Sequence, residues 1–231
     1  MNDKRIKAIV WDLDGTLIHF KIDWIRARRE AIKILKNEGV PKKMLTIKNS
    51  ILDNVRLARN YYESLGYSSE KIEKIIKKVN HVVNEIEYEA ALDATAVDGI
   101  ETVLKYLKNK KLKQAIYTFN TNRNAQVSLE KTKLIQYFDV IIGRDSVKNA
   151  KPHPEHLSLI CMELNVLPSE IIVIGDTHRD IEGALNVGAK SIAIKTKLSN
   201  LTNLEILEKA NKIINDFEIS KKLIKAIENL L

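Results

Sequence analysis

Two acidic residues, Asp12 and Asp14, stand two positions apart directly after an apolar run over residues 6–11. The run is typical of a short buried strand, and alternate residues of an extended chain point to the same side. Both carboxylates could therefore face one site, where two acids suit a divalent cation and a phosphate group. Gly15 ends the strand and lets the backbone turn sharply. The same residues could also form an Asp-Gly hairpin turn. The choice between a cation and phosphate site and a simple turn therefore depends on other segments of the chain.

Three later apolar stretches, at 113–119, 138–143 and 170–175, are also predicted as strands and are also followed by polar side chains. Ligands of open parallel sheets bind beyond the carboxyl ends of the strands, so these side chains should converge on one rim. Together they supply carboxylates, a hydroxyl group and a lysine, which are the groups that phosphoryl transfer needs. In chain order the candidates are Thr118, Phe119, Asn120, Lys151, Asp176 and Asp180.

The segments that must position these residues alternate between strands and helices after about residue 96. Such alternation implies right-handed crossovers and a parallel sheet that is covered on both faces. The strand at 6–12 has no other sheet to join. We therefore predict an α/β fold with a three-layer, Rossmann-like parallel sheet core. Its remaining strands are expected at 190–195 and 212–215, and its helices at 99–110, 121–135, 154–165, 177–187, 201–210 and 218–230.

Residues 23–90 contain no predicted strand, and their apolar positions recur at helical spacing. The expected helices are 24–37, 42–65 and a third that begins at Ser68 or Ser69, both good N-cap residues. The preceding residues 15–22 are expected to form a loop or a small hairpin. We therefore predict an inserted all-helical domain at 20–95 and a core domain made of residues 1–19 and 96–231.

The composition is that of an ordinary soluble protein, with 231 residues of which 45% are hydrophobic and 29% charged. The formal net charge is +8, which is compatible with nucleic acid, an acidic membrane or a small anion as partner. The lysines are spread along predicted helix faces, and the acids of the rim would repel nucleic-acid phosphates, so we expect no nucleic-acid partner.

The cysteine content and the hydropathy indicate the compartment. Cys161 is the only cysteine, so no internal disulfide is possible, and its apolar surroundings indicate packing in a core. The amino-terminal residues lack a signal-peptide pattern, and no apolar run reaches membrane-spanning length. We therefore expect a cytoplasmic protein without a membrane partner.

The ordered set of rim motifs resembles the haloacid dehalogenase superfamily, in its magnesium-dependent phosphatase branch similar to phosphoglycolate phosphatase. That family shows Asp-x-Asp-Gly-Thr at the first strand, Ser or Thr ending the second, a Lys often followed by Pro, and Gly-Asp-x-x-x-Asp after the fourth. The resemblance spans about residues 6–195, and the helical insert has the place of the family's cap domain. The matching residues are Asp12-Leu13-Asp14-Gly15-Thr16, Thr118, Lys151-Pro152, and Gly175-Asp176 with Asp180.

The resemblance implies distinct roles for the two acids of the first motif. Asp12 would be the nucleophile that attacks phosphorus to give an aspartyl-phosphate. Asp14 would protonate the leaving alcohol and then take a proton from the water that hydrolyses this intermediate. For that role the pKa of Asp14 must be raised well above about 4.

The resemblance also implies a phosphate site and a metal site. Thr118, Phe119 (through its backbone N–H), Asn120 and Lys151 would bind the phosphate, and Thr118 and Lys151 count among the catalytic residues with Asp12 and Asp14. Mg²⁺ would be held by Asp12, the backbone carbonyl of Asp14, Asp176 and Asp180, the last directly or through water.

The expected function is therefore Mg²⁺-dependent hydrolysis of a small phosphorylated metabolite, phosphoglycolate-like or a sugar phosphate. Such phosphatases often carry a small polar or acidic residue soon after the first motif, whereas this chain has Leu17-Ile18-His19-Phe20. This difference bears on the choice of substrate. Two alternatives stay open: a phosphomutase or other phosphotransferase of the same superfamily, and a non-catalytic regulatory protein with the same fold. A monomer and a homodimer are both compatible with the sequence.

Overall fold

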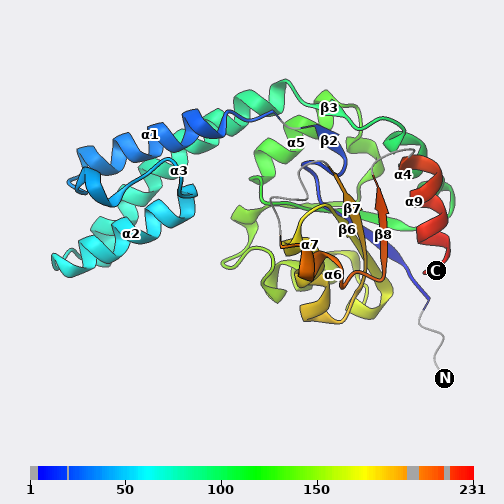
Figure 1. The fold of residues 1–231 in the computed structure, drawn as a ribbon. Coiled ribbons are helices and arrows are strands. Elements are labelled where there is room, and N and C mark those ends of the chain that lie inside the picture. Colours follow the sequence, from blue (N-terminus) through cyan, green and yellow to red (C-terminus); the bar gives the residue numbers. More distant parts are fainter. Residues whose placement is uncertain (1–4, 20, 197–202, 216–218) are drawn as a thin grey trace. The chain divides into compact units, whose positions relative to one another are not determined.

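Figure 1 shows the fold in a computed structural model, which describes residues 5–19, 21–196, 203–215 and 219–231. The chain divides into two compact units, one of residues 1–20 and 91–231 and one of residues 21–90. The larger unit thus includes residues 91–95, which the sequence analysis assigned to the insert.

A six-stranded parallel sheet forms the centre of the larger unit. Its strands are β1 (Ala8–Trp11), β4 (Lys113–Tyr117), β5 (Val140–Ile142), β6 (Ile171–Gly175), β7 (Lys190–Lys195) and β8 (Lys212–Asn215). The order across the sheet is β5-β4-β1-β6-β7-β8, so β1 pairs in parallel with both β4 and β6. All four residues of β1 are buried, as expected for a central strand of a sheet that is covered on both faces.

Helices cover both faces of this sheet and give the three layers that the sequence predicts (Figure 1). Ile9 and Trp11 of β1 belong to one apolar cluster, and Ala8 and Val10 belong to another on the opposite face. The first cluster includes α4 (Ile100–Asn109), α5 (Asn122–Lys131) and α9 (Ile219–Glu228). The opposite face carries α6 (Pro154–Leu164), α7 (His178–Val187) and α8 (Leu204–Leu207). The predicted Rossmann-like α/β fold is therefore confirmed. Short 3-10 helices lie at Ile135–Tyr137, Arg144–Ser146 and Pro168–Glu170.

A second, two-stranded sheet lies in the larger unit next to the ends of the insert. β2 (Ile18–His19) pairs antiparallel with β3 (Thr95–Ala96). The expectation of a loop or a local hairpin at 15–22 is corrected here, because the partner of β2 lies on the far side of the insert in sequence.

The smaller unit is helical and has its own apolar core. It contains α1 (Trp24–Asn37), a 3-10 helix (Lys42–Met44), α2 (Ile51–Ser64) and most of α3 (Ser69–Leu92). The side chain of Asp23 accepts a hydrogen bond from the backbone N–H of Arg26 at 2.8 Å and so caps α1. Leu35, Tyr62 and Val79, one from each helix, are fully buried.

The predicted helix at 42–65 is wrong in its first part. A single 3-10 turn is followed by an irregular segment, and α2 begins only at Ile51, where Ser50 caps it by accepting from the backbone N–H of Asp53. Buried Asn54 holds the irregular segment, because its amide donates to the carbonyl of Thr46 at 2.9 Å and accepts from the N–H of Thr46 at 3.2 Å.

The carboxyl-terminal elements are shorter than predicted. α8 covers Leu204–Leu207 instead of 201–210, and α9 ends at Glu228. The predictions at 15–22, 201–210 and 218–230 include residues 20, 201, 202 and 218, which lie outside the described residues. Within the described part of the chain, no helix is both long and apolar enough to cross a membrane.

Candidate active site

The acids of the first and last motifs meet because their strands are neighbours. Trp11 at the end of β1 pairs with Ile174 of β6, and the backbone N–H of Asp12 donates to the carbonyl of Ile174 at 2.8 Å. Asp12 and Asp176 therefore follow adjacent parallel strands at the same edge of the sheet, and both are buried.

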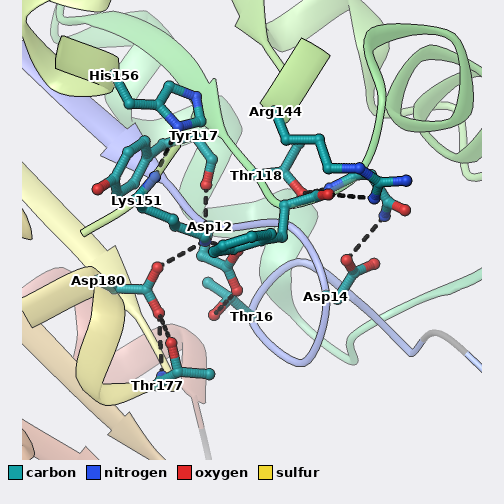
Figure 2. A network of polar contacts seen from close by, with 12 residues as sticks. Asp12, Asp14, Thr16, Tyr117, Thr118, Arg144, Lys151, His156, Thr177 and Asp180 are labelled. Carbon is teal, nitrogen blue, oxygen red and sulfur yellow. Dashed lines mark hydrogen bonds and ion pairs between the residues drawn. The ribbon is translucent and has the colours of Figure 1, made fainter. Parts of the chain in front are cut away.

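The buried ammonium group of Lys151 lies among these acids (Figure 2). It donates to Asp12 Oδ1 at 2.5 Å, to Asp180 Oδ1 at 2.7 Å and to the backbone carbonyl of Tyr117 at 3.0 Å. Burial by itself lowers the pKa of Lys151, but the carboxylates of Asp12 and Asp180 outweigh it and hold this pKa above its ordinary value. Lys151 is therefore a permanent positive charge beside Asp12.

The carboxyl groups of Asp12 and Asp176 have raised pKa values for related reasons. Burial raises the pKa of Asp12 to about 6, and the neighbouring charge of Lys151 limits the increase. Burial, together with repulsion from Asp12 and Asp180, raises the pKa of Asp176 to about 8. In the absence of a cation, the ionised form of Asp176 is thus disfavoured more strongly than that of Asp12.

Three acids form a group of the right kind for a hard divalent cation. Asp12, Asp176 and Asp180 each offer a carboxylate oxygen, and these oxygens lie within 4.8 Å of one another. Among the described residues, the buried Oδ1 of Asp176 has no hydrogen-bond partner, and such an oxygen costs free energy unless something binds it. An all-oxygen donor set fits Mg²⁺, so the residues present suit this ion.

Besides belonging to the group of three acids, Asp180 makes hydrogen bonds that a metal ligand would not need. Its Oδ1 accepts from Lys151, and its Oδ2 accepts from the backbone N–H of Thr177 at 3.0 Å and from the Thr177 hydroxyl at 2.6 Å. These bonds cap the first turn of α7 and fix Lys151 at the same time. The carboxylate is fully buried.

Asp14 is only half-buried and its side chain meets a different partner. Asn120 donates from Nδ2 to Asp14 Oδ2 at 2.8 Å. Thr118, fully buried at the end of β4, accepts through Oγ1 from the backbone N–H of Asn120 at 3.0 Å. The loop after β4 therefore joins Thr118 and Asn120, two of the four predicted phosphate-binding residues, to the second acid of the first motif.

Phe119 lies in the same loop. Its backbone carbonyl accepts from the guanidinium group of Arg144, and the guanidinium carbon of Arg179 lies 5.3 Å from the centre of its ring. The structure thus brings all eight predicted site residues to one edge of the larger unit. Five of the eight, Asp12, Asp14, Thr118, Lys151 and Asp180, are labelled in Figure 2.

His156 supports the backbone of Lys151, a role that the sequence did not predict. Its Nδ1 accepts from the backbone N–H of Lys151 at 3.3 Å, and its Nε2 lies 2.9 Å from the carbonyl of Ile142. A neutral ring with the proton on Nε2 satisfies both contacts. Burial lowers the pKa of His156 to about 4, although the Ile142 carbonyl opposes the shift. The only signal in the sequence was its nearness to Lys151-Pro152.

Gly15 is required where it stands for two reasons. Its φ of +83° lies in the left-handed region. A Cβ atom at this position would also come within 2.4 Å of Asp176 Oδ2. The turn after Asp14 therefore passes directly against the carboxyl group of Asp176.

Residues 9–194 match the family described as haloacid dehalogenase-like hydrolase. The chain therefore belongs to this family of enzymes, whose motifs the sequence analysis identified.

Among similar proteins is a pyrophosphatase, PpaX, of Bacillus cereus (strain B4264). It is 30% identical over 216 residues, which cover 87% of this chain and 88% of PpaX.

Two solved structures share the fold. A predicted phosphoglycolate phosphatase of Haemophilus somnus has a TM-score of 0.64 at 19% identity, over 97% of this chain and 100% of that one. The β-phosphoglucomutase of Clostridium difficile has a TM-score of 0.64 at 22% identity, over 97% and 96%.

Proposed function

We propose that this enzyme is a Mg²⁺-dependent phosphatase that hydrolyses a small phosphorylated metabolite through a phosphorylated Asp12. The observation that carries the proposal is the buried ammonium of Lys151, 2.5 Å from Asp12 Oδ1 and beside the group of three acids. A positive charge in this place keeps Asp12 ionised and ready to attack.

Asp12 and Asp176 would hold the cation, together with the backbone carbonyl of Asp14. When bound, Mg²⁺ reduces the repulsion between the carboxylates and an anionic phosphate group. We assign Asp180 to the fixation of Lys151, with a contact to the cation through water, because Lys151 and Thr177 already use both of its oxygens.

The side chains of Asp12 and Asp14 would carry out the two chemical steps. Asp12 attacks phosphorus, the bond from phosphorus to the leaving oxygen breaks, and Asp14 donates its proton to that oxygen. Asp14, now a carboxylate, then takes a proton from water as the water attacks phosphorus. The bond from phosphorus to Asp12 breaks, inorganic phosphate leaves, and both acids return to their starting forms.

Lys151 and Thr118 would act on charge that develops during these steps. Lys151 is oriented by Asp180 and Tyr117 and would neutralise charge on the phosphoryl group and on Asp12. Thr118 would donate its hydroxyl proton to a phosphate oxygen while it continues to accept from Asn120.

We propose a phosphoglycolate-like acid or a sugar phosphate as substrate. The PpaX relative is named a pyrophosphatase, which adds inorganic pyrophosphate to the compounds that should be tested. A panel with Mg²⁺ should therefore contain p-nitrophenyl phosphate, phosphoglycolate, sugar phosphates, nucleotides and pyrophosphate.

The decisive experiment measures inorganic phosphate released from this panel by the wild-type enzyme and by Asp12→Asn. We expect turnover by the wild type, its loss in EDTA, its recovery with Mg²⁺, and a loss of at least about 10³-fold in Asp12→Asn. Circular dichroism shows whether the variant remains folded. Near-normal activity of folded Asp12→Asn would contradict the mechanism. Transfer of phosphate between sugar positions without net phosphate release would instead identify a phosphomutase.

A further inference from the structure

The amide of Asn120 is used within the protein and does not point freely toward a ligand. Asn120 is 3% exposed, and its Nδ2 donates to Asp14 Oδ2 at 2.8 Å. The sequence predicts Asn120 in the phosphate site. In the structure Asn120 instead contacts Asp14, the acid that would donate and accept the proton in the proposed reaction.

The backbone of Asn120 is fixed from both sides. Its N–H donates to Thr118 Oγ1 at 3.0 Å, and its carbonyl accepts from the backbone N–H of Arg144 at 2.9 Å. Gly143 lies so close that a Cβ atom there would come within 2.6 Å of the Asn120 carbonyl oxygen. The side-chain amide is therefore presented to Asp14 from a rigid loop.

We infer that Asn120 is a positioning residue, which sets the orientation of the Asp14 carboxyl group for proton transfer and is not a phosphate ligand. The inference rests on the proposed function. An amide N–H can only donate, so Asp14 Oδ2 accepts from Asn120, and this contact fixes the orientation of the Asp14 carboxyl group.

The same hydrogen bond also favours the proton transfer. A hydrogen bond to an ionised acceptor is about twice as strong as one to a neutral acceptor. The bond from Asn120 thus strengthens while Asp14 gives its proton to the leaving oxygen, and it holds the resulting carboxylate in place for the water step.

Two esters with one aromatic ring each separate this role from phosphate binding. p-Nitrophenyl phosphate has a leaving group that departs without a proton, whereas benzyl phosphate releases an alkoxide that needs one. The quantity to compare is kcat/KM, because it reports the step in which the leaving group departs even when the water step limits kcat.

In Asp14→Asn we expect kcat/KM to fall about 10²-fold or more on benzyl phosphate and much less on p-nitrophenyl phosphate. Asn120→Ala should show the same selectivity in weaker form, with a loss at least about tenfold larger on benzyl phosphate. Its inhibition constant for inorganic phosphate should stay within about twofold of the wild type.

Asn122→Ala is the matched control, at the start of α5 directly after the loop. Asn122 accepts from the backbone N–H of Gly143 at 2.6 Å and donates to Ser146, so its loss disturbs the loop without removing the bond to Asp14. It should change both esters by the same factor. Asn120→Leu keeps a side chain of similar shape without a donor or a charge, so it gives the same readout if Asn120→Ala does not fold.

Equal losses on both esters in folded Asn120 variants, with Asp14→Asn still selective, would overturn the positioning role and leave the proposed function intact. Weaker inhibition by inorganic phosphate in Asn120→Ala, again without ester selectivity, would restore Asn120 to the phosphate site. If Asp14→Asn itself shows no selectivity, the acid role of Asp14 in the proposed function fails, and the inference fails with it.

Discussion

At the scale of single residues, the surrounding protein disfavours the ionised form of Asp176 more strongly than that of Asp12. Its pKa is raised to about 8, first by burial and then by Asp12 and Asp180. An unfolded chain would release this proton near pH 4, so between pH 4 and 8 the native state binds more protons than the unfolded state. Stability therefore falls as pH rises through this range.

We predict that Asp176→Asn stabilises the metal-free protein and removes its response to Mg²⁺. At pH 8 in EDTA the variant should be more stable than the wild type by at least about 1 kcal/mol, because the opposed charge is gone. Added Mg²⁺ should raise the Tm of the wild type only, since ligand binding to the native state stabilises it. Thermal unfolding followed by circular dichroism measures both effects.

Glu163→Gln is a suitable control for this experiment, because Glu163 is an exposed acid on α6 outside the site. It should change neither the Tm in EDTA nor the shift with Mg²⁺. A wild-type Mg²⁺ shift that survives in Asp176→Asn would show that Asp176 does not hold the cation.

At the scale of elements, His156 joins the start of α6 to the end of β5 and to the Lys151 backbone. The ring is fully buried and neutral, with a pKa lowered to about 4 from an ordinary value of 6.5. In acid the unfolded state takes up a proton first, so this contribution to stability is present above pH 6.5 and is lost as pH falls toward 4.

We predict that His156→Gln makes the stability less dependent on pH between 6.5 and 4. The lowered pKa of His156 corresponds to about 3 kcal/mol lost by the wild type across this range, and the variant should not lose it. Urea unfolding at several pH values measures the free energy of unfolding. Parallel curves for the two proteins would contradict a buried neutral His156.

The turn after β1 gives a second prediction at this scale, through two glycines with similar backbone conformations. Gly15 has φ +83° and Gly188, at the end of α7, has φ +71°. Alanine at either position costs about 1 kcal/mol of backbone strain. A Cβ at Gly188 meets no atom within 4 Å, whereas one at Gly15 meets Asp176 Oδ2 at 2.4 Å.

We predict that Gly15→Ala lowers Mg²⁺ affinity and phosphatase activity by at least about tenfold, because the Asp176 carboxylate must rotate away. Gly188→Ala should lower the Tm and leave Mg²⁺ affinity and kcat/KM unchanged. Steady-state assays across a Mg²⁺ titration distinguish the two variants. The same loss of Mg²⁺ affinity in both would attribute the effect to backbone strain.

The elements that the sequence predicts well are those with local signals. Each buried strand is an apolar run, and polar residues mark its carboxyl end, so the rim of the site follows from parallel topology. β2 could not be predicted in the same way. It has two residues, and its partner β3 lies beyond the whole insert. The irregular segment before α2 depends on one buried side chain, Asn54, which helical periodicity does not reveal.

The site residues also divide into those with a local signal in the sequence and those without one. Asp12, Lys151 and Asp176 stand in motifs with fixed spacing, so the sequence predicted that they would lie together. The contact between Asn120 and Asp14 and the role of His156 depend on how loops from different strands pack. A histidine on a helix face has no pattern that separates a structural support from an ordinary core residue.

At the scale of the whole molecule, the larger unit holds the ends of the insert in its own small sheet. Ile18 pairs with Ala96 and His19 with Thr95, and the backbone N–H of Val97 donates to the carbonyl of Leu17 at 2.9 Å. The insert in turn has its own buried core. Each unit therefore has the contacts that an independent folding unit needs.

We predict that the larger unit folds when residues 21–90 are replaced by about six Gly and Ser residues. The shortened protein should unfold cooperatively and should still gain thermal stability from Mg²⁺, because Asp12, Asp176 and Asp180 all belong to the larger unit. Circular dichroism and thermal scans with and without Mg²⁺ test this. A chain without a cooperative transition would show that the core depends on the insert.

The central position of β1 has a consequence for the order of assembly during translation. β1 is made first, but its neighbours in the sheet are residues 113–116 and 171–174. At roughly 5–20 residues per second, Asp176 is synthesised on the order of 10 to 30 seconds after Asp12. The insert, rich in local contacts, can fold in that interval, whereas the sheet must wait for its last central strand. A prematurely terminated polypeptide that lacks β6 can therefore never bring the acid cluster together.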